Sequence, residues 1–242
     1  MTVVHGVDGC SKGWIRVSVS LDPENKELSA KVFETAEALF DDGPPTKIGI
    51  DIPIGLPATA SRKCDKDARK LLKFPRSSSV FPVPMRAALN PKFTYKAACD
   101  ANEKQCGKRL PQQSYAILPK IREVDDWLRK NPELGKQVYE VHPEVSFYYW
   151  NEEKPMEYAK KSGFGFLERY KLVTAQHGEK AVLKIRKEHK RSDVADDDIL
   201  DAIAAAWTAR RINFGEKKKK YKCIPEGVPE RDEMGLPMQM LA

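Results

Sequence analysis

Two aspartates near the end of the chain have the spacing of a metal-binding pair. Asp198 and Asp201 are three residues apart in the segment 197–207, whose apolar residues recur at helical spacing. On a helix the two side chains share one face, with Cβ atoms about 5–6 Å apart. Asp201 also lies on the face that should touch the core, among alanines and isoleucines. Because a buried carboxylate without a partner is costly, we expect a cation or strong hydrogen-bond donors beside it.

Two further aspartates each end a predicted strand. Asp8 ends the apolar segment that begins at residue 3, and Asp51 ends the strand predicted over 47–52. Three strands joined by tight turns and then a helical crossover predict that the first and fourth strands are parallel neighbours. Both carboxylates should then emerge at the carboxyl edge of the sheet, where open α/β sheets bind ligands. A late helix packed on this sheet would bring Asp198 and Asp201 to the same place.

Four neighbouring carboxylates indicate a particular chemistry. Unpaired, they would repel one another by several kcal/mol at an intermediate dielectric constant. A hard divalent cation relieves that repulsion, and oxygen ligands favour Mg²⁺ or Mn²⁺. Two such ions about 3.5–4 Å apart can activate a water and stabilise the leaving oxygen of a phosphodiester. We therefore predict catalytic and metal-binding roles for Asp8, Asp51, Asp198 and Asp201.

Each of these aspartates also has a purely structural interpretation. Asp8 and Asp51 could be turn residues at strand ends. The acidic run 196–198 falls in a first helical turn, where carboxylates cap the helix and oppose its dipole. We assign this structural role to Asp196 and Asp197. We assign a functional role to Asp198, because it is in phase with Asp201.

A second group of candidates lies away from the aspartates. Glu140, His142 and Glu144 alternate along a predicted fifth strand, so they should point to one side. Either glutamate could be an additional metal ligand, with Glu140 the one chosen, and His142 could carry a proton or contact substrate. A solvated sheet face explains the same pattern equally well. Around the Ser- and Pro-rich segment 75–84, basic and hydroxyl side chains could contact phosphate or could simply be solvated. The predicted substrate-binding residues are Lys12, Arg69, Arg76, Ser78, Arg86, His142 and Glu144.

The elements that must position these residues indicate an α/β fold with a mixed five-stranded sheet flanked by helices. Strands are predicted over 3–7, 14–20, 28–33, 47–52 and 138–141, and helices over 34–40, 64–72, 92–104, 112–130, 165–176, 179–190 and from 197 to a stop at Gly215. We expect one domain over 1–242, in which residues 58–135 form a mostly helical insertion between the fourth and fifth strands.

Composition bounds the class of protein. The 242 residues are 41% hydrophobic, contain no apolar run of membrane-spanning length, and do not begin like a signal peptide. Five scattered cysteines predict reduced thiols in the cytoplasm and no zinc site. The net charge of +7 favours nucleic acid as a partner, although the run Lys217 to Lys220 supplies part of it. Phe81 and Trp207 are expected in the core rather than against bases.

The motifs together resemble a known superfamily. They are residues 6–10 (GVDGC), 49–57 (GIDIPIGLP), 76–84 (RSSSVFPVP), 139–144 (YEVHPE) and 197–201 (DDILD). In this order, across about 3–215, they look like a family known only as predicted ribonuclease H-like nucleases, a domain of unknown function. The late helix is similar to that of RuvC-type Holliday-junction resolvases. The resemblance implies a ribonuclease H-like fold and, by analogy, a nuclease. RuvC-type enzymes carry Glu where this chain has Asp51, whose shorter side chain changes the reach to a metal.

The sequence is also compatible with two other functions. Sugar kinases and actin-like ATPases also begin with a strand and an Asp-x-Gly loop that holds phosphate, and the segment 8–12 is faintly similar. An ATP- or nucleotide-binding phosphotransferase-like protein is therefore one alternative, although those proteins need two such domains. A nucleic-acid-binding protein that kept the fold without catalysis is another. RNA and DNA are equally open as substrates, and a homodimer is considered because cutters of branched DNA are commonly dimers.

Overall fold

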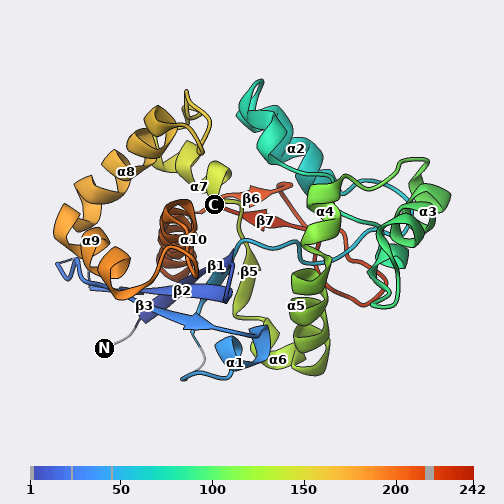
Figure 1. Cartoon of the computed structure of the whole chain (residues 1–242), viewed down its shortest axis with the longest axis horizontal. Helices are drawn as coiled ribbons and strands as arrows, with labels where there is room; N and C mark the ends of the chain where they lie inside the picture. The colour runs from blue at the N-terminus through green and yellow to red at the C-terminus, as the bar shows by residue number, and fades with distance from the viewer. Residues whose placement is uncertain (1–2, 23, 45, 216–220) are drawn as a thin grey trace.

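A five-stranded mixed sheet organises the chain (Figure 1). The computed structural model describes residues 3–22, 24–44, 46–215 and 221–242, so the run Lys217 to Lys220 lies outside the described residues. The strands are β1 (Val3–Cys10), β2 (Gly13–Ser20), β3 (Leu28–Phe33), β4 (Ile48–Ile50) and β5 (Val138–Glu140). Their order in the sheet is β3-β2-β1-β4-β5. The predicted fold class, a mixed five-stranded α/β sheet flanked by helices, is confirmed.

The pairing of β1 with its two neighbouring strands sets the geometry of the candidate site. β1 runs antiparallel to β2, with Cys10 opposite Gly13, and parallel to β4, with Val7 opposite Ile50. The backbone N–H of Asp51 donates to the carbonyl oxygen of Val7, which extends this parallel register by one residue. Asp8 and Asp51 therefore lie together where the parallel pairing of β1 with β4 ends, as the predicted strand order required. The prediction that the first strand ends at Asp8 is wrong, because β1 continues to Cys10 in its pairing with β2.

Seven helical segments lie between β4 and β5. They are α2 (Lys63–Leu72), the short 3₁₀ helices η1 (Arg76–Ser79) and η2 (Arg86–Leu89), α3 (Tyr95–Cys106), α4 (Gln112–Ala116), α5 (Leu118–Lys130) and α6 (Pro132–Gly135). The prediction of one helix over 112–130 is wrong. The chain is divided at Ile117, because Pro119 has no N–H to donate to a carbonyl four residues earlier.

The remaining helices lie outside this insertion. They are α1 (Ala36–Phe40), α7 (Pro143–Trp150), α8 (Gly163–His177), α9 (Glu179–Glu188) and α10 (Asp196–Gly215), and a small separate sheet pairs β6 (Cys223–Ile224) with β7 (Met240–Leu241). The expected alternation of Glu140, His142 and Glu144 along one strand is wrong. β5 ends at Glu140, and Pro143 begins α7, which places Glu144 in a first helical turn.

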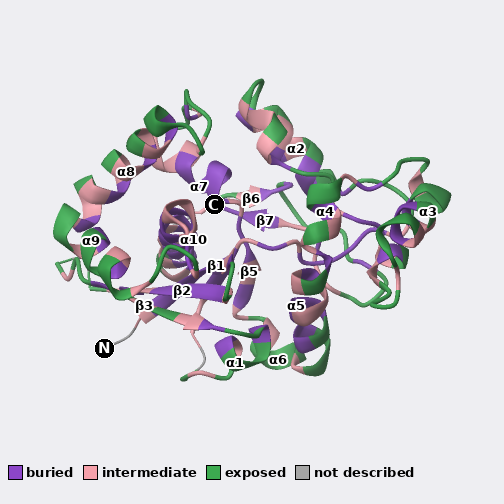
Figure 2. Ribbon diagram, viewed as in Figure 1, coloured by how far each residue is buried: buried purple, intermediate pink, exposed green. Residues whose placement is uncertain are grey.

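Two apolar cores cover the two faces of the sheet (Figure 2). One joins β1 and β4 to α1 and α5 through residues such as Val7, Ile50 and Ile121. The other joins β1 and β2 to α8, α9 and α10 through residues such as Ile15 and Ile203. The helix that carries the acidic pair is therefore fixed by the core beneath it, which keeps its first turns in one position.

The contact between α10 and the sheet is unusually close. A Cβ atom on Gly6 would overlap the carbonyl oxygen of Ala202, and one on Gly49 would come within 2.6 Å of the carbonyl oxygen of Ala205. Glycine on the strands and alanine on the helix therefore let the two backbones touch. This close packing brings the first turns of α10 to the edge where β1 and β4 end.

The structure also bears on the cysteines and on membrane-spanning helices, two features considered from composition. All five cysteines are free thiols. Among the described residues, no helix combines the length and apolar character needed to cross a membrane.

Candidate functional site

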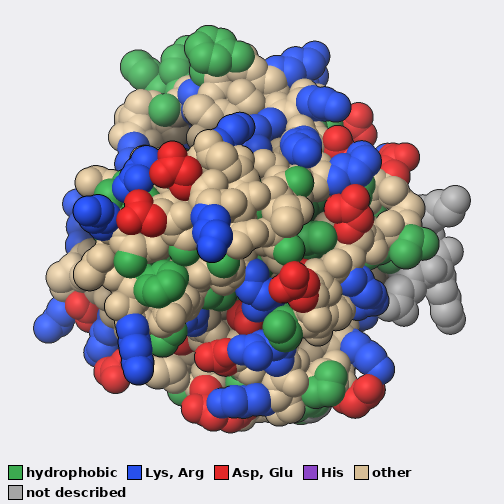
Figure 3. All heavy atoms as spheres, turned by 90° about the vertical axis from the view of Figure 1, so that its right-hand side faces the viewer, with side chains coloured by type: hydrophobic (Ala, Val, Ile, Leu, Met, Phe, Trp, Pro, Cys, Tyr) green, Lys and Arg blue, Asp and Glu red, His purple; other side chains and the backbone are tan. Residues whose placement is uncertain are grey.

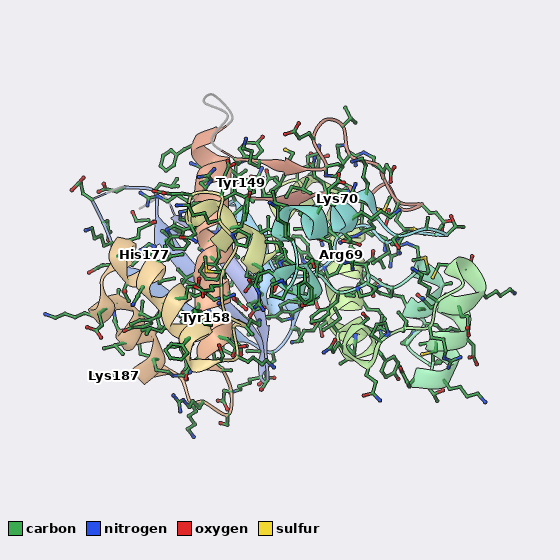
Figure 4. All side chains as sticks on the ribbon, turned by 90° about the horizontal axis from the view of Figure 1, so that it is seen from above. Arg69, Lys70, Tyr149, Tyr158, His177 and Lys187 are labelled. Carbon is green, nitrogen blue, oxygen red and sulfur yellow. The ribbon has the colours of Figure 1, made fainter. Side chains whose placement is uncertain are left out.

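A cavity of about 560 Å³ opens at the carboxyl ends of β1 and β4. Asp8, Asp51 and Asp201 line it from three different elements. Its other walls come from the segments 76–83 and 159–161 and from the start of α7. In the view from above, α2 with Arg69 lies on one side and the segment before α8, with Tyr158, lies on the other (Figure 4). The structure thus brings three of the four predicted catalytic aspartates into one cavity.

Asp8 is buried at this edge, with 9% of its surface exposed. One of its oxygens, Oδ1, accepts a hydrogen bond from the backbone N–H of Gly9 at 2.7 Å. Burial, followed by repulsion from Asp51 and Asp201, raises the pKa of Asp8 well above its ordinary value. The structure therefore makes a negative charge on Asp8 costly unless a cation is close by.

The pKa of Asp51 is shifted by two groups that also shift the pKa of Asp8, namely Asp201 and Lys160. Burial raises its pKa to about 6, with a further contribution from Asp201, while His142 and Lys160 act in the opposite direction. The charge of Asp201 therefore acts on both Asp8 and Asp51, and that of Asp51 acts on Asp8, which places the three carboxylates close together in space.

Asp201 has the cationic partner that its burial required. It is 1% exposed, and Lys160 Nζ donates to its Oδ2 at 2.6 Å. The same ammonium lies 3.8 Å from Asp197. Burial alone would lower the pKa of Lys160, but Asp201, Asp8 and Asp51 outweigh it and raise that pKa. Lys160 is a functional candidate that the sequence analysis missed, because it lies 41 residues from Asp201 in a segment without regular structure.

Asp198 differs from the other three aspartates. Its Oδ2 accepts the backbone N–H of Ala195 at 2.8 Å, which is the contact of a helix-capping residue, and it does not line the cavity. Its metal role is therefore the least supported of the four. Asp196 pairs with Arg186 at 3.0 Å and Arg191 at 2.6 Å, in keeping with the structural role assigned to it.

Glu140 lines the cavity but is held by other groups. Arg62 donates to both of its oxygens, at 2.6 and 2.7 Å, and the backbone N–H of Ile54 donates to one of them at 2.7 Å. Asp65 completes this buried network, 2.7 Å from Arg62. Both Glu140 oxygens are thus committed to the protein, which argues against the predicted metal role.

The predicted substrate-binding residues divide into two groups. Four of them line the cavity: Arg76, Ser78, His142 and Glu144. The other three do not. Arg69 donates to the carbonyl oxygen of Val80, Arg86 pairs with Asp125 at 2.8 Å and with Asp232, and Lys12 is exposed in the turn between β1 and β2. Arg69 and Arg86 therefore hold loops in place, and the substrate role predicted for these three residues finds no support in their positions.

Three buried side-chain atoms of cavity-lining residues have no hydrogen-bond partner in the part of the chain that the structure describes. They are Arg76 Nε, His142 Nδ1 and Glu144 Oε2. The other ring nitrogen of His142 lies 3.2 Å from the carbonyl oxygen of Ser79, and the other oxygen of Glu144 accepts from Arg169 at 2.5 Å. His142 and Glu144 are therefore held by these contacts, while one buried polar atom of each, and Nε of Arg76, has no partner among the described residues.

The two aromatic residues predicted for the core, Phe81 and Trp207, differ in how far they are buried. Phe81 lines the cavity and is 44% exposed, so the core prediction for it is wrong. Its neighbours Pro82 and Pro84 keep the chain extended there and prevent it from folding inward. Trp207 stacks on Trp150 with ring centroids 5.2 Å apart, in a partly buried contact.

Within the described ranges, no three Asp, Glu, His or Cys side chains are already arranged to hold a metal ion. The ammonium of Lys160, rather than a third ligand, lies against Asp201. The carboxylates are gathered in one cavity, but they do not form a complete ligand set as they stand.

Comparison with known proteins gives a family for the chain. Neither a search of curated proteins nor a search of solved structures found a match. A family described as "Protein of unknown function (DUF429)" matches residues 6–230. Because this match covers nearly the whole sequence, the chain belongs to the DUF429 family.

Proposed function

We propose that this protein is a metal-dependent nuclease that hydrolyses phosphodiester bonds of RNA or DNA. The observation that carries the proposal is the meeting of Asp8, Asp51 and Asp201, from β1, the end of β4 and α10, in one cavity. Burial and mutual repulsion raise the pKa values of Asp8 and Asp51. Perturbed carboxylates in a cleft are typical of functional sites, because stability alone does not favour them.

The donor set fits Mg²⁺ or Mn²⁺ in its chemistry. All three side chains offer hard oxygen ligands, and their charge requires a cation. A bound divalent ion would supply Lewis-acid activation of water and of the scissile phosphate. Asp8, Asp51 and Asp201 would hold it, after rotating away from their present partners. Asp201 has to release Lys160 for this, so the lysine and the ion compete for one carboxylate.

Other residues of the chain have separate tasks in this proposal. His142 lies close enough to Asp51 to affect the pKa of that carboxyl, and its Nδ1 has no partner among the described residues, so its imidazole can contact a bound substrate at the edge of the site. Arg76, whose Nε is also unpartnered, can bind a phosphate oxygen. Both residues line the same cavity as the carboxylates.

The nucleotide-binding alternative is less well supported. A phosphate loop needs several backbone N–H groups that converge on one anion. In this chain Cys10 pairs with Gly13, which leaves only Ser11 and Lys12 in a tight turn. Lys12 does not line the cavity.

A cleavage assay tests the proposal. We expect the purified protein to cut at least one of single-stranded RNA, single-stranded DNA, an RNA–DNA hybrid or a branched duplex when Mg²⁺ or Mn²⁺ is present. Asp8→Asn and Asp201→Asn should each reduce the rate at least 100-fold, because each removes a charged ligand. Asp100→Asn, at an exposed ion pair on α3, is the matched control and should retain full activity. If no substrate is cut, or if the two site variants cut as fast as the control, the proposal fails.

A further inference from the structure

We propose that the cavity takes one unpaired nucleotide, with its phosphate toward the carboxylates and its base against Phe81. This inference rests on the proposed function and names its substrate class. The nucleotide could be part of a single strand or a free mononucleotide, because both carry the same chemistry.

The depth of the site argues against an intact duplex. Asp201 is 1% exposed and Asp8 is 9% exposed, so the reacting groups lie within the cavity and not on a surface. The cavity volume of about 560 Å³ is in the range of sites for single small molecules. A nucleotide held in a double helix is paired and stacked, and it must leave the stack to enter such a pocket. An unpaired nucleotide enters without that cost.

One wall of the cavity suits a nucleobase. It is built from apolar residues of the segment between β4 and β5, namely Val80, Phe81, Pro82, Val83 and Ile117. Phe81 is 44% exposed, although a phenyl ring is normally more stable when covered. A base that stacks on an aromatic ring gains about 1–3 kcal/mol, whatever its sequence. Phe81 is therefore placed to receive a base.

The polar groups of the cavity suit the rest of a nucleotide. Glu144 is 5% exposed, and its unpartnered Oε2 can only accept a hydrogen bond when the carboxyl is ionised. Arg76 Nε, also unpartnered, can only donate. Both side chains line the cavity, and a ligand that carries both an acceptor and a donor would complement them. A nucleotide does so, because its phosphate oxygens accept and its sugar hydroxyls or base N–H groups donate. Lys160 and Lys161 in the same lining add positive charge for the phosphate.

Equilibrium binding without divalent ions separates this inference from catalysis. The probes are a fluorescein-labelled 12-nucleotide single strand, as RNA and as DNA, and the blunt duplex of the same sequence, with anisotropy read in EDTA. We expect the full-length protein to bind the single strands at least tenfold more tightly than the duplex. Phe81→Ala should weaken single-strand binding about tenfold, and Phe81→Trp should restore it. Competition by adenosine and uridine 5′-monophosphates shows whether a free mononucleotide is enough.

Phe214→Ala is the matched control. Phe214 is 41% exposed, close to the value for Phe81, but it lies 13 residues beyond Asp201 on α10, about 20 Å along the helix axis. This variant should bind like the unmodified protein.

Equal affinity for duplex and single strand, or equal affinity of Phe81→Ala and Phe214→Ala, would overturn the inference. Binding that depends on Phe81 without any cleavage in Mn²⁺ would support the pocket and refute the nuclease. Cleavage that Phe81→Ala does not affect would support the nuclease and refute the pocket.

Discussion

Lys160 supplies positive charge to three carboxylates that would otherwise repel one another. It hydrogen-bonds directly to Asp201, and its pKa is also raised by Asp8 and Asp51. A partly exposed ammonium in this position can stabilise the acidic cavity before any ligand binds. It also gives a divalent ion a competitor within the protein.

Removing that competitor should strengthen metal binding. Two unit charges 4 Å apart interact by about 4 kcal/mol at an effective dielectric constant of 20. Even a third of that energy corresponds to a tenfold change in affinity, so Lys160→Met should bind Mn²⁺ at least tenfold more tightly in isothermal titration calorimetry. Lys161→Met, at the next residue of the same wall, is the control and should change the affinity far less. Equal affinities for both variants and the unmodified protein would contradict a competing role for Lys160.

Asp51 should make the stability of the protein depend on pH. Its pKa is raised to about 6 in the folded state by burial and by Asp201, whereas its ordinary value is 3.8. The folded protein therefore binds this proton more tightly than the unfolded chain, and the free energy of unfolding falls as the pH rises from about 4 to about 6. Asparagine has no proton to lose, so Asp51→Asn removes that fall.

Thermal unfolding in EDTA at pH 4.5 and pH 8 measures this effect. We expect Asp51→Asn to have little effect on Tm at the lower pH and to raise it at the higher pH, by about 2 kcal/mol or several degrees. Asp100→Asn, whose side chain is 53% exposed, should show no such difference between the two pH values. The same Tm change for Asp51→Asn at both pH values would show that the Asp51 carboxylate is not destabilised in the fold.

At the scale of elements, the site depends on how closely α10 lies against β1. Asp201 reaches the strand ends only because Gly6 leaves room for the carbonyl oxygen of Ala202. A methyl group there has to move backbone atoms and not a flexible side chain. The position of Asp201 is therefore tied to a glycine on another element.

Gly6→Ala should accordingly be severely destabilising, by about 3 kcal/mol or more, because it overpacks a buried backbone contact. Gly163→Ala, at the first position of α8 with no atom near the added Cβ, should be neutral or slightly stabilising. Urea unfolding of the two variants measures both effects. If Gly6→Ala is as stable as Gly163→Ala, the close approach of α10 to β1 is wrong.

The elements differ in how well the sequence predicts them. Alternating strands and the late apolar helix carry strong periodic signals, so the sheet, the parallel pairing of β1 with β4 and the convergence of Asp8, Asp51 and Asp201 were predictable. Contacts between distant segments have no local signal. The approach of Lys160 to Asp201 is one example.

The same limit explains the errors at Glu140 and Glu144. Glu140 is bound by Arg62, which lies 78 residues away, so spacing along the chain could not reveal its partner. Glu144 was placed on a strand because alternation continued past the strand end, although Pro143 is a common first residue of a helix. Local residue types therefore predicted the carboxylates, and only the packed structure reveals which of them already have partners.

At the scale of the whole molecule, the net charge of +7 is not gathered on the face shown in Figure 3. Basic and acidic side chains alternate over that face. We expect contact with nucleic acid to be centred on the cavity and its rim, where Arg76, Lys160 and Lys161 lie. Few phosphates would then be neutralised.

The salt dependence of binding tests this picture. Single-strand binding that neutralises about three phosphates gives a slope of about −2 in a plot of log K against log salt concentration, since each phosphate contributes about −0.7. We expect this slope for the 12-nucleotide single strand between about 50 and 200 mM NaCl. A slope steeper than about −5 would indicate a broad basic surface that engages many phosphates.

The central claim is that the carboxylates of Asp8, Asp51 and Asp201 converge to hold a divalent cation. Anomalous diffraction from a crystal soaked in Mn²⁺ tests it most directly. The account predicts a peak in the cavity, with oxygens of these aspartates about 2.1 Å from it and with Lys160 Nζ moved away from Asp201. A cavity without an anomalous peak at saturating Mn²⁺, in which Lys160 still hydrogen-bonds to Asp201, would contradict it.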